Sequence, residues 1–384
     1  MAAKTIKLDS RAKRYAAIAA CIAALVFAFF VVKWTLGNAA STRADLPEIA
    51  QLTTQLAPDD PQTHYATAVL LEKQFDIASL DAAVMEYEKA AALSPSNYLY
   101  WLALGTARER NGDPTGGERA LRKALELAPN YSRVLWALGN LLVRQGRIDE
   151  GFAEIRQAVA NDGSFSDVAA VTAWRLLGGE VPAVRKALGD SERLNASLSM
   201  LLANENRLDE ALSVWNGLTP ESKRGSLVDA GAKLAQKVLE AKRYRDALKL
   251  RIELGLESTQ AGVITNGGFE EPIKTQIIGI FDWQITAGEP QIAPTSGQKH
   301  SGNVSLALIF NSTNSSDFRT LSQTVAVGPG QEYDFEAFYR ADLKTKVGFT
   351  WEIVDAANNT VITSTEATAP SADWTRLQTR FRVS

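Results

Sequence analysis

A segment in the middle of the chain repeats itself every 34 residues. Pro95 and Pro129 are 34 positions apart, and so are Gly105 and Gly139. A period of this length is typical of a helix–turn–helix unit that stacks on copies of itself. Such a unit cannot bury its apolar face alone, so neighbouring units share one core and leave a concave groove. The period therefore predicts a helical scaffold that holds a partner, not one that turns over a substrate.

The residues within each unit resemble the tetratricopeptide repeat, whose pattern is W-x2-L-G-x2-Y, then A-x3-F, then P. One unit carries Trp101-x2-Leu104-Gly105 at the start of this pattern. The match is strong over residues 64–163, and weaker units follow it. We therefore expect an all-α, tetratricopeptide-type solenoid over residues 61–260.

Two glycines depart from this pattern, because Gly117 and Gly151 stand where the family has alanine. Glycine inside a helix costs roughly 1 kcal/mol relative to alanine. Either these glycines allow a closer helix contact, or the second helix of each unit starts later. In both cases we expect Gly105 and Gly139 to lie where two helices touch.

The resemblance also implies which side chains line the groove. The first-helix spacing of the family turns seven of them toward it: Tyr65, Glu72, Thr106, Arg110, Trp136, Asn140 and Arg144. This mixture of aromatic and polar groups suits a peptide or a helix of a protein partner. The sequence lacks the cluster of basic residues and asparagines that would clamp a partner's C-terminal carboxylate.

An apolar segment near the N-terminus predicts a membrane anchor. Residues 15–32 carry no charge and, as a helix, would span roughly 27 Å, close to the hydrocarbon core of a bilayer. We expect a transmembrane helix over residues 15–36. Residues 1–14 hold five basic residues and one acidic residue, which indicates that this basic tail stays in the cytoplasm. The bulk of the chain is then periplasmic or extracellular, as in a single-pass protein of the inner membrane.

A cleaved signal peptide is the alternative to an anchor. The small residues Gly37-Asn38-Ala39-Ala40 resemble a cleavage site. Against it, the apolar segment is longer than a usual signal core, and Lys33 separates it from this site. Residues 37–60 are expected to be a linker, with a short helix over residues 49–56.

The hydrophobic pattern changes to alternation in residues 261–384, which predicts an all-β sandwich. Turn-forming clusters bound the expected strands, one of them at residues 370–373. The five expected strands are Leu306–Phe310, Leu321–Val327, Tyr333–Arg340, Val347–Val354 and Arg376–Val383.

This region resembles the jelly-roll carbohydrate-binding modules attached to bacterial cellulases and xylanases. The resemblance rests on Asn266-Gly267-Gly268-Phe269-Glu270, on Trp283, and on the segment from Leu321 to Phe335. It implies a jelly-roll sandwich over residues 261–384. Members of this family continue for a few tens of residues more, so we expect a sandwich that is incomplete at the C-terminus, or a chain that is a fragment.

Carbohydrate binding needs an aromatic face together with polar groups for the hydroxyls. The resemblance places three tryptophans at positions that usually pack the core, with a ligand platform as the alternative for each: Trp283, Trp351 and Trp374. The opposite face of the strands offers a candidate carbohydrate site of four residues: Glu336, Phe338, Arg340 and Glu352. A solvated outer sheet is the alternative for this face.

The family often carries a structural calcium ion near its first strand. If the ion is present here, the resemblance implies Glu270 as a metal ligand, with oxygen atoms as the other ligands. No other cofactor is expected.

The bulk composition excludes several functions. The net charge is −3, which gives no electrostatic support for a nucleic-acid partner. One cysteine, Cys21, cannot form an intramolecular disulfide, and two histidines leave little material for a catalytic triad or a histidine metal site. We therefore expect a protein that is not an enzyme.

Together these features predict a membrane-anchored envelope scaffold. Its repeat groove would hold a protein partner, and its sandwich would contact polysaccharide or another envelope component, as in exopolysaccharide assembly or export. One alternative is a periplasmic chaperone-like adaptor in which the sandwich is a spacer. Another is the non-catalytic part of a glycoside hydrolase.

Overall fold

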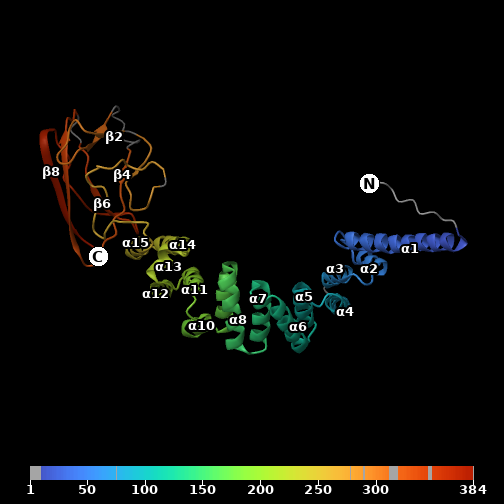
Figure 1. Cartoon of the computed structure of the whole chain (residues 1–384). Coiled ribbons are helices and arrows are strands. Elements are labelled where there is room, and N and C mark those ends of the chain that lie inside the picture. Colours follow the sequence, from blue (N-terminus) through green and yellow to red (C-terminus); the bar gives the residue numbers. More distant parts are fainter. Residues whose placement is uncertain are drawn as a thin grey trace. The chain divides into compact units, whose positions relative to one another are not determined.

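The computed structural model describes residues 10–74, 76–276, 278–288, 290–310, 319–344 and 348–383. Most of the expected cytoplasmic tail, residues 1–9, lies outside these ranges, as does part of the strand expected at residues 347–354. The chain divides into two compact units, Met1–Leu194 and Asn195–Ser384 (Figure 1).

The first unit is helical throughout its described residues. Helix α1 is followed by α2 and then by helices that alternate as the first and second members of each repeat. Their bounds are α1 Arg11–Ser41, α2 Pro47–Leu56, α3 Pro61–Glu72, α4 Ile77–Leu93, α5 Tyr98–Arg110, α6 Pro114–Leu127, α7 Ser132–Arg144, α8 Ile148–Asn161, a 3-10 turn Gly163–Phe165, α9 Ser166–Leu176 and α10 Val181–Leu188. Helix α11, Glu192–Asn204, continues into the second unit.

Acidic and amide side chains start the helices of the repeats. Asp60, Asp76, Asn97 and Asp113 each precede a helix, and their side-chain oxygens accept a backbone N–H from its first turn. Such caps satisfy donors that have no partner within the helix. The local sequence therefore fixes where each of these helices begins.

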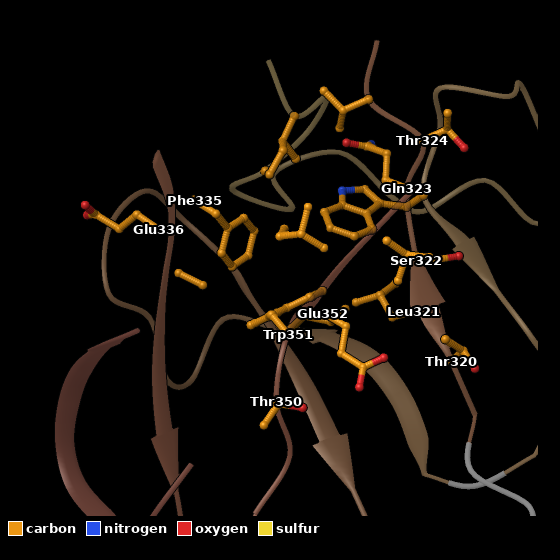
Figure 2. A pocket seen from close by; sticks show the side chains of 18 of the residues that line it. Thr320, Leu321, Ser322, Gln323, Thr324, Phe335, Glu336, Thr350, Trp351 and Glu352 are labelled. Atoms are coloured by element: carbon orange, nitrogen blue, oxygen red, sulfur yellow. The ribbon is translucent and has the colours of Figure 1, made fainter. Parts of the chain in front are cut away.

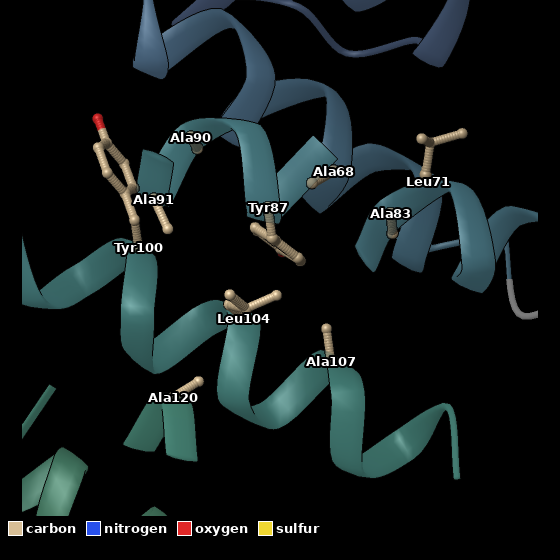
Figure 3. Close-up of a cluster of buried hydrophobic side chains, with 10 residues drawn as sticks. All are labelled: Ala68, Leu71, Ala83, Tyr87, Ala90, Ala91, Tyr100, Leu104, Ala107 and Ala120. Atoms are coloured by element: carbon tan, nitrogen blue, oxygen red, sulfur yellow. The ribbon is translucent and has the colours of Figure 1, made fainter. Parts of the chain in front are cut away.

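The core of the first repeats is built from small side chains with a few large ones between them. Figure 3 shows Tyr87 of α4 pointing toward Leu104 of α5, with both side chains nearly inaccessible to solvent. The full cluster is Ala68, Leu71, Ala83, Tyr87, Ala90, Ala91, Tyr100, Leu104, Ala107 and Ala120. Alanines at the crossing points let the helix backbones approach, as the repeat pattern predicts.

In two repeats, glycines lie where the first helix touches the second. The prediction that Gly105 and Gly139 occupy such contacts is confirmed. A Cβ atom on Gly105 would lie 2.6 Å from Leu121 Cγ, and one on Gly139 would lie 2.8 Å from the Gly151 carbonyl oxygen. Helices α6 and α8 begin before Gly117 and Gly151. The second helices therefore do not start later, and the glycines at these positions serve a closer contact.

Helix α1 is long and apolar enough to cross a membrane, and none of its most apolar stretch is buried. It continues to Ser41, and its end contacts the segment before α3. Asn38 Nδ2 donates to Asp60 Oδ2 at 2.7 Å, and Gly37 lies against Ala57. The expected linker, residues 37–60, thus holds the last turn of α1 and all of α2, both packed on the first repeat.

The second unit contains the remaining helices and all the strands of the described residues. The helices are α12 Leu208–Asn216, α13 Pro220–Arg224, α14 Val228–Glu240 and α15 Tyr244–Glu253. The strands are β1 Gln284–Ile285, β2 Gln291–Thr295, β3 Ser305–Ile309, β4 Leu321–Ser322, β5 Glu332–Ala341, β6 Glu352–Asp355, β7 Thr360–Ser364 and β8 Ser371–Arg382.

The described strands pair as four two-stranded antiparallel ladders, β1–β4, β2–β3, β5–β8 and β6–β7. The turn predicted at residues 370–373 is wrong, because β8 begins at Ser371. The register shifts between the pairs Tyr339–Thr375 and Ala341–Ser371, where the extra residues lie on β8, so the pairing extends into the Pro-Ser-Ala-Asp segment as far as Ser371. The expectation of a missing C-terminal strand stays a prediction.

Aromatic side chains fill the space between the ladders. Trp283 lies 5.2 Å from Phe269 and 6.0 Å from Trp351, which in turn lies 5.7 Å from Phe335, measured between ring centroids. Trp283 is buried and Trp351 is half-buried. These contacts support the core role expected for the two tryptophans.

The strand region packs directly on the last helix of the second unit. Leu248 of α15 forms a buried cluster with Phe281 and Ala326. The Tyr244 hydroxyl donates to the Ala356 carbonyl oxygen at 3.2 Å. Helix α15 therefore has an apolar neighbour on the face that a further repeat would otherwise cover.

Candidate binding surfaces

The seven residues predicted for the repeat groove all lie on first helices of the repeats. Tyr65 and Glu72 belong to α3, Thr106 and Arg110 to α5, and the remaining three to α7: Trp136, Asn140 and Arg144. The structure thus brings them to equivalent helices of three successive units. A groove that binds a partner at this face stays a prediction.

Tyr65 belongs to the edge of the core. Its ring lies 5.8 Å from that of Tyr87 and 5.3 Å from that of Tyr100, and the side chain is half-buried. Burial, with a further contribution from the Glu72 carboxylate, raises the pKa of the Tyr65 hydroxyl. Tyr65 therefore contributes to packing between α3, α4 and α5 as well as to the surface.

The charged residues of this face pair with one another across successive first helices. Arg110 of α5 pairs with Glu72 of α3 at 3.3 Å, and Arg144 of α7 pairs with Glu109 of α5 at 2.5 Å. Glu72 also accepts a hydrogen bond of 2.8 Å from the Tyr87 hydroxyl. A partner that used either arginine would have to displace a glutamate. Sequence reasoning missed Glu109, which lies 35 residues before Arg144, one more than the repeat period.

The other predicted groove residues bond to their own helices. The Thr106 hydroxyl donates to the Leu102 carbonyl oxygen at 3.1 Å, and Asn140 Nδ2 donates to the Trp136 carbonyl oxygen at 2.8 Å. The Trp136 ring packs on Phe165 with 5.1 Å between centroids and remains half-exposed. Trp136 therefore offers an aromatic surface that is already supported by a neighbour.

In the strand region, successive side chains of β5 point to two opposite sides, one exposed and one half-buried. Glu336, Phe338 and Arg340 are exposed, as predicted, while the residues between them are half-buried. Figure 2 shows the side chains of Phe335 and Glu336 on opposite sides of β5. Glu352 is exposed too, but it belongs to the separate β6–β7 ladder. The structure thus brings together three of the four predicted carbohydrate-site residues.

Ion pairs occupy one half of this outer face. Asp334 of β5 pairs with Arg380 of β8 at 2.7 Å, and Glu336 pairs with Arg376. The hydrogen bond from Arg380 lowers the pKa of the Asp334 carboxyl. Carboxylates held in this way are less available to the hydroxyl groups of a ligand.

Aromatic rings occupy the other half. The His300 ring stacks on the Phe338 ring with 3.9 Å between centroids and 11° between planes, and the Trp374 ring meets His300 edge-on at 5.7 Å. Arg340 donates to the side-chain oxygen of Gln298 beside this group. His300, Phe338, Trp374, Arg340 and Gln298 are called the aromatic platform from here on.

Sequence reasoning missed three members of the platform. Trp374 was expected at a position that usually packs the core, with a ligand platform as the alternative, and its ring contact with His300 places it with the platform. The wrong turn at residues 370–373 concealed that Trp374 lies within β8. His300 and Gln298 lie on the loop between β2 and β3, and local sequence gives no signal that this loop reaches β5.

Glu270 anchors that loop. Its carboxylate accepts the backbone N–H of Asn303 at 2.9 Å and that of Val304 at 3.4 Å. The bond from Asn303 is the main reason that the pKa of Glu270 is lowered. Within the described ranges, no three acidic, histidine or cysteine side chains gather as a metal site would require. A calcium ion at Glu270 stays a prediction, and the anchoring of the loop does not depend on it.

A large cavity lies between the ladders, with the side chains of Phe335 and Trp351 around it (Figure 2). Its volume is about 3720 Å³, several times the 300–1,000 Å³ of a typical small-molecule site. It extends along most of the strand region instead of enclosing one ligand. The five platform residues are among those that line it, so we take the platform as the candidate site within this larger hollow.

Two family models match the chain. Residues 261–384 match the family described as a carbohydrate binding domain, and residues 74–132 and 102–164 match the tetratricopeptide repeat. The chain thus contains tetratricopeptide repeats within residues 74–164, a domain of the carbohydrate-binding class at residues 261–384 and an apolar helix near its N-terminus.

Three solved structures have repeats similar to those of this chain. YrrB, described as a tetratricopeptide-repeat protein with an unusual peptide-binding site, is 18% identical over 53% of this chain and 90% of its own, with a TM-score of 0.28. MamA is 14% identical over 56% of this chain and 95% of its own length, with a TM-score of 0.33. PilF of Pseudomonas aeruginosa is 16% identical over 59% of this chain and 90% of its own length, with a TM-score of 0.32. These low scores add no argument about function. No curated protein matches the chain.

Proposed function

We propose that the protein is a non-enzymatic, membrane-anchored scaffold that binds polysaccharide through its C-terminal domain and a protein partner through its repeats. The observation that carries the proposal is the aromatic platform on the outer side of β5 and β8. It belongs to a domain of the carbohydrate-binding class, and it combines the exposed rings of His300 and Phe338 and the half-buried ring of Trp374 with polar groups.

The platform has the chemistry that a sugar ring requires. The apolar face of a pyranose packs on aromatic rings, and a few placed polar groups fix its hydroxyls. Phe338 is 39% exposed and His300 is exposed, so their rings are accessible. Arg340 and Gln298 lie beside them as a guanidinium donor and an amide that can donate and accept.

The repeats support the second half of the proposal. Tetratricopeptide units present a concave surface, and the face of α3, α5 and α7 combines the half-exposed Trp136 ring with paired charges. Two interhelical ion pairs with exposed arginines give this surface both signs of charge. Such a surface suits a peptide or helix that carries apolar and charged groups together.

The N-terminal helix supports anchoring in a membrane. Five basic residues precede its apolar stretch, so residues 1–14 would stay in the cytoplasm and the repeats would lie outside. Cleavage after Ala40 would remove Gly37 and Asn38, which contact Ala57 and Asp60. The packing of the end of α1 thus favours an uncleaved anchor over a signal peptide.

Protease treatment of intact spheroplasts tests the anchor. Digestion of residues 61–260 is expected, with the full-length mass retained in untreated membranes. Protection of the repeats would overturn the orientation, and a mature chain that starts near residue 40 would establish a cleaved signal peptide.

Screening the detergent-solubilised full chain against a polysaccharide library tests the carbohydrate half. Saturable binding by the wild type that Phe338→Ala abolishes is expected. Absence of any binding would favour a chaperone-like adaptor in which the domain is a spacer. Binding by a hydrolytic assembly that contains the chain, with hydrolysis of the same glycan, would favour the non-catalytic part of a glycoside hydrolase. A role in exopolysaccharide assembly or export follows only if the bound glycan is one the cell secretes.

A further inference from the structure

One histidine of the first repeat lies buried against the turn between α2 and α3. His64 of α3 is 6% exposed. Its Nδ1 atom lies 2.5 Å from Glu86 Oε2 of α4, and its Nε2 atom lies 2.8 Å from the carbonyl oxygen of Pro58, just after α2. Both ring nitrogens are therefore within hydrogen-bonding distance of an oxygen.

These two oxygens constrain the protonation state of the ring. A carbonyl oxygen only accepts hydrogen bonds, and so does an ionised carboxylate. A neutral imidazole has one N–H and one lone pair, so it would leave one of the two short contacts without a proton. A buried polar group without a partner is costly. While Glu86 is ionised, as its lowered pKa favours, only the doubly protonated imidazolium satisfies Glu86 and Pro58 at once.

The contact joins two parts of the chain. Pro58 lies in the short turn that leads from α2 to α3, and the Thr63 hydroxyl donates to the Ala57 carbonyl oxygen of the same turn at 3.0 Å. Asp60 of this turn holds Asn38 at the end of α1. His64 and Glu86 therefore connect the end of α1 and the turn to the second helix of the first repeat.

The charged groups near His64 are few. Glu86 faces it directly, and Lys89 on the same helix pairs with the other Glu86 oxygen at 2.7 Å. Asp60 is engaged by Asn38 and by the backbone N–H of Gln62, and Asp59 is exposed. The Glu86 carboxylate is thus the charge that faces the ring.

We propose that His64 is a pH-sensitive latch, which holds residues 57–60 on the first repeat while its ring carries two protons and releases them when the ring loses one. The latch is a property of the fold and does not depend on glycan binding. If α1 is anchored as proposed above, the latch would set how firmly the repeats are held next to the membrane.

The direction of the pH response follows from the two partners. The hydrogen bond to Glu86 raises the pKa of His64 above its ordinary value of 6.5, against the opposing effect of burial. The stability from this raised pKa is fully present below pH 6.5 and is lost as the pH rises through the raised value. Burial raises the pKa of Glu86, but the bonds from His64 and Lys89 outweigh it and lower the net value. That contribution is lost as the pH falls through the lowered value.

Nuclear magnetic resonance of the imidazole rings tests the latch in the solubilised full chain. The sequence has two histidines, so ¹⁵N-histidine labelling gives two ring systems, and His300→Gln assigns them. We expect both ring nitrogens of His64 to be protonated at pH 6, with a midpoint above 6.5. Glu86→Gln should lower that midpoint, while Lys89→Ala, the matched control on the same helix, should not lower it. A neutral His64 ring at pH 6 would overturn the proposal.

Amide hydrogen exchange on the same protein tests release of the segment. After correction for intrinsic rates, peptides covering residues 57–64 should exchange at least tenfold faster at pH 8.5 than at pH 6. Glu86→Gln should remove most of this difference, as should His64→Gln if that variant folds. Equal corrected rates at the two pH values in the wild type would show that the segment is held by other contacts, and that the latch does not exist.

Discussion

Gly139 of α7 and Gly151 of α8 lie directly against each other. A Cβ atom on Gly139 would come within 2.8 Å of the Gly151 carbonyl oxygen, and a Cβ atom on Gly151 would come within 2.6 Å of the Gly139 carbonyl oxygen. Gly105 and Gly117 make the equivalent contact one unit earlier, with corresponding distances of 3.1 and 2.8 Å. Glycine at these positions sets the spacing of the two helices in each unit.

Gly139→Ala should therefore destabilise the repeats, although alanine is the better helix former by roughly 1 kcal/mol. The added methyl group forces α7 and α8 apart, and overpacking of this kind costs about 1–3 kcal/mol. Urea unfolding followed by circular dichroism measures the change. Gly268→Ala, whose Cβ would be 3.6 Å from its nearest neighbour, should leave the helical transition unchanged. A more stable Gly139→Ala protein would contradict the contact.

The packing of the strand region on α15 predicts that the two unfold together. Leu248 is 3% exposed, and removing its side chain leaves a cavity beside Phe281, at a cost of about 2–5 kcal/mol. Leu248→Ala should separate the near-ultraviolet signal of the strand region from the helical transition. Ile252→Ala, on the same helix but 38% exposed, is the control. Coincident transitions in both variants would show that the contact does not couple them.

The anchoring of the loop by Glu270 predicts an acid limit for glycan binding. Because its pKa is lowered in the folded protein, the anchoring is present above the ordinary carboxylate pKa and is lost as the pH falls through the lowered value. Binding should weaken there, since His300 leaves Phe338 when the loop moves. Glu270→Gln should bind weakly at neutral pH and lose the acid dependence, as measured by titration calorimetry. Unchanged binding by this variant would separate the loop from the site.

The repeats could be predicted from the sequence because their signals are local and periodic. The pairs Gly105 and Gly139, Gly117 and Gly151, and Pro95 and Pro129 recur at a spacing of 34 residues, and the glycine contacts lie between the two helices of one unit. The alternation along β5 likewise placed Phe338 and Arg340 on an exposed face.

The rest of the site depends on contacts between distant segments. His300 contacts Phe338 on a β2–β3 loop that Glu270 holds, and Trp374 lies in the stretch of β8 where its pairing with β5 is irregular. Neither of these two contacts follows from a local periodicity of the sequence. The pairing of Arg144 with Glu109 was missed for a similar reason, since it connects two repeats and not two turns of one helix.

Glycan affinity of variants on the outer face of β5 and β8 tests the central claim most directly. Calorimetric titration would use the full chain and the polysaccharide found in the library screen. Phe338→Ala and Trp374→Ala should each weaken binding by at least about tenfold, as expected for anchor residues of a site. Two control variants change the separate β6–β7 ladder: Glu352→Ala and Val361→Ala, the latter at an exposed residue of β7. Their affinity should stay within about threefold of wild type, because residues outside the centre of a site contribute little to binding. Wild-type affinity in both Phe338→Ala and Trp374→Ala would contradict the account.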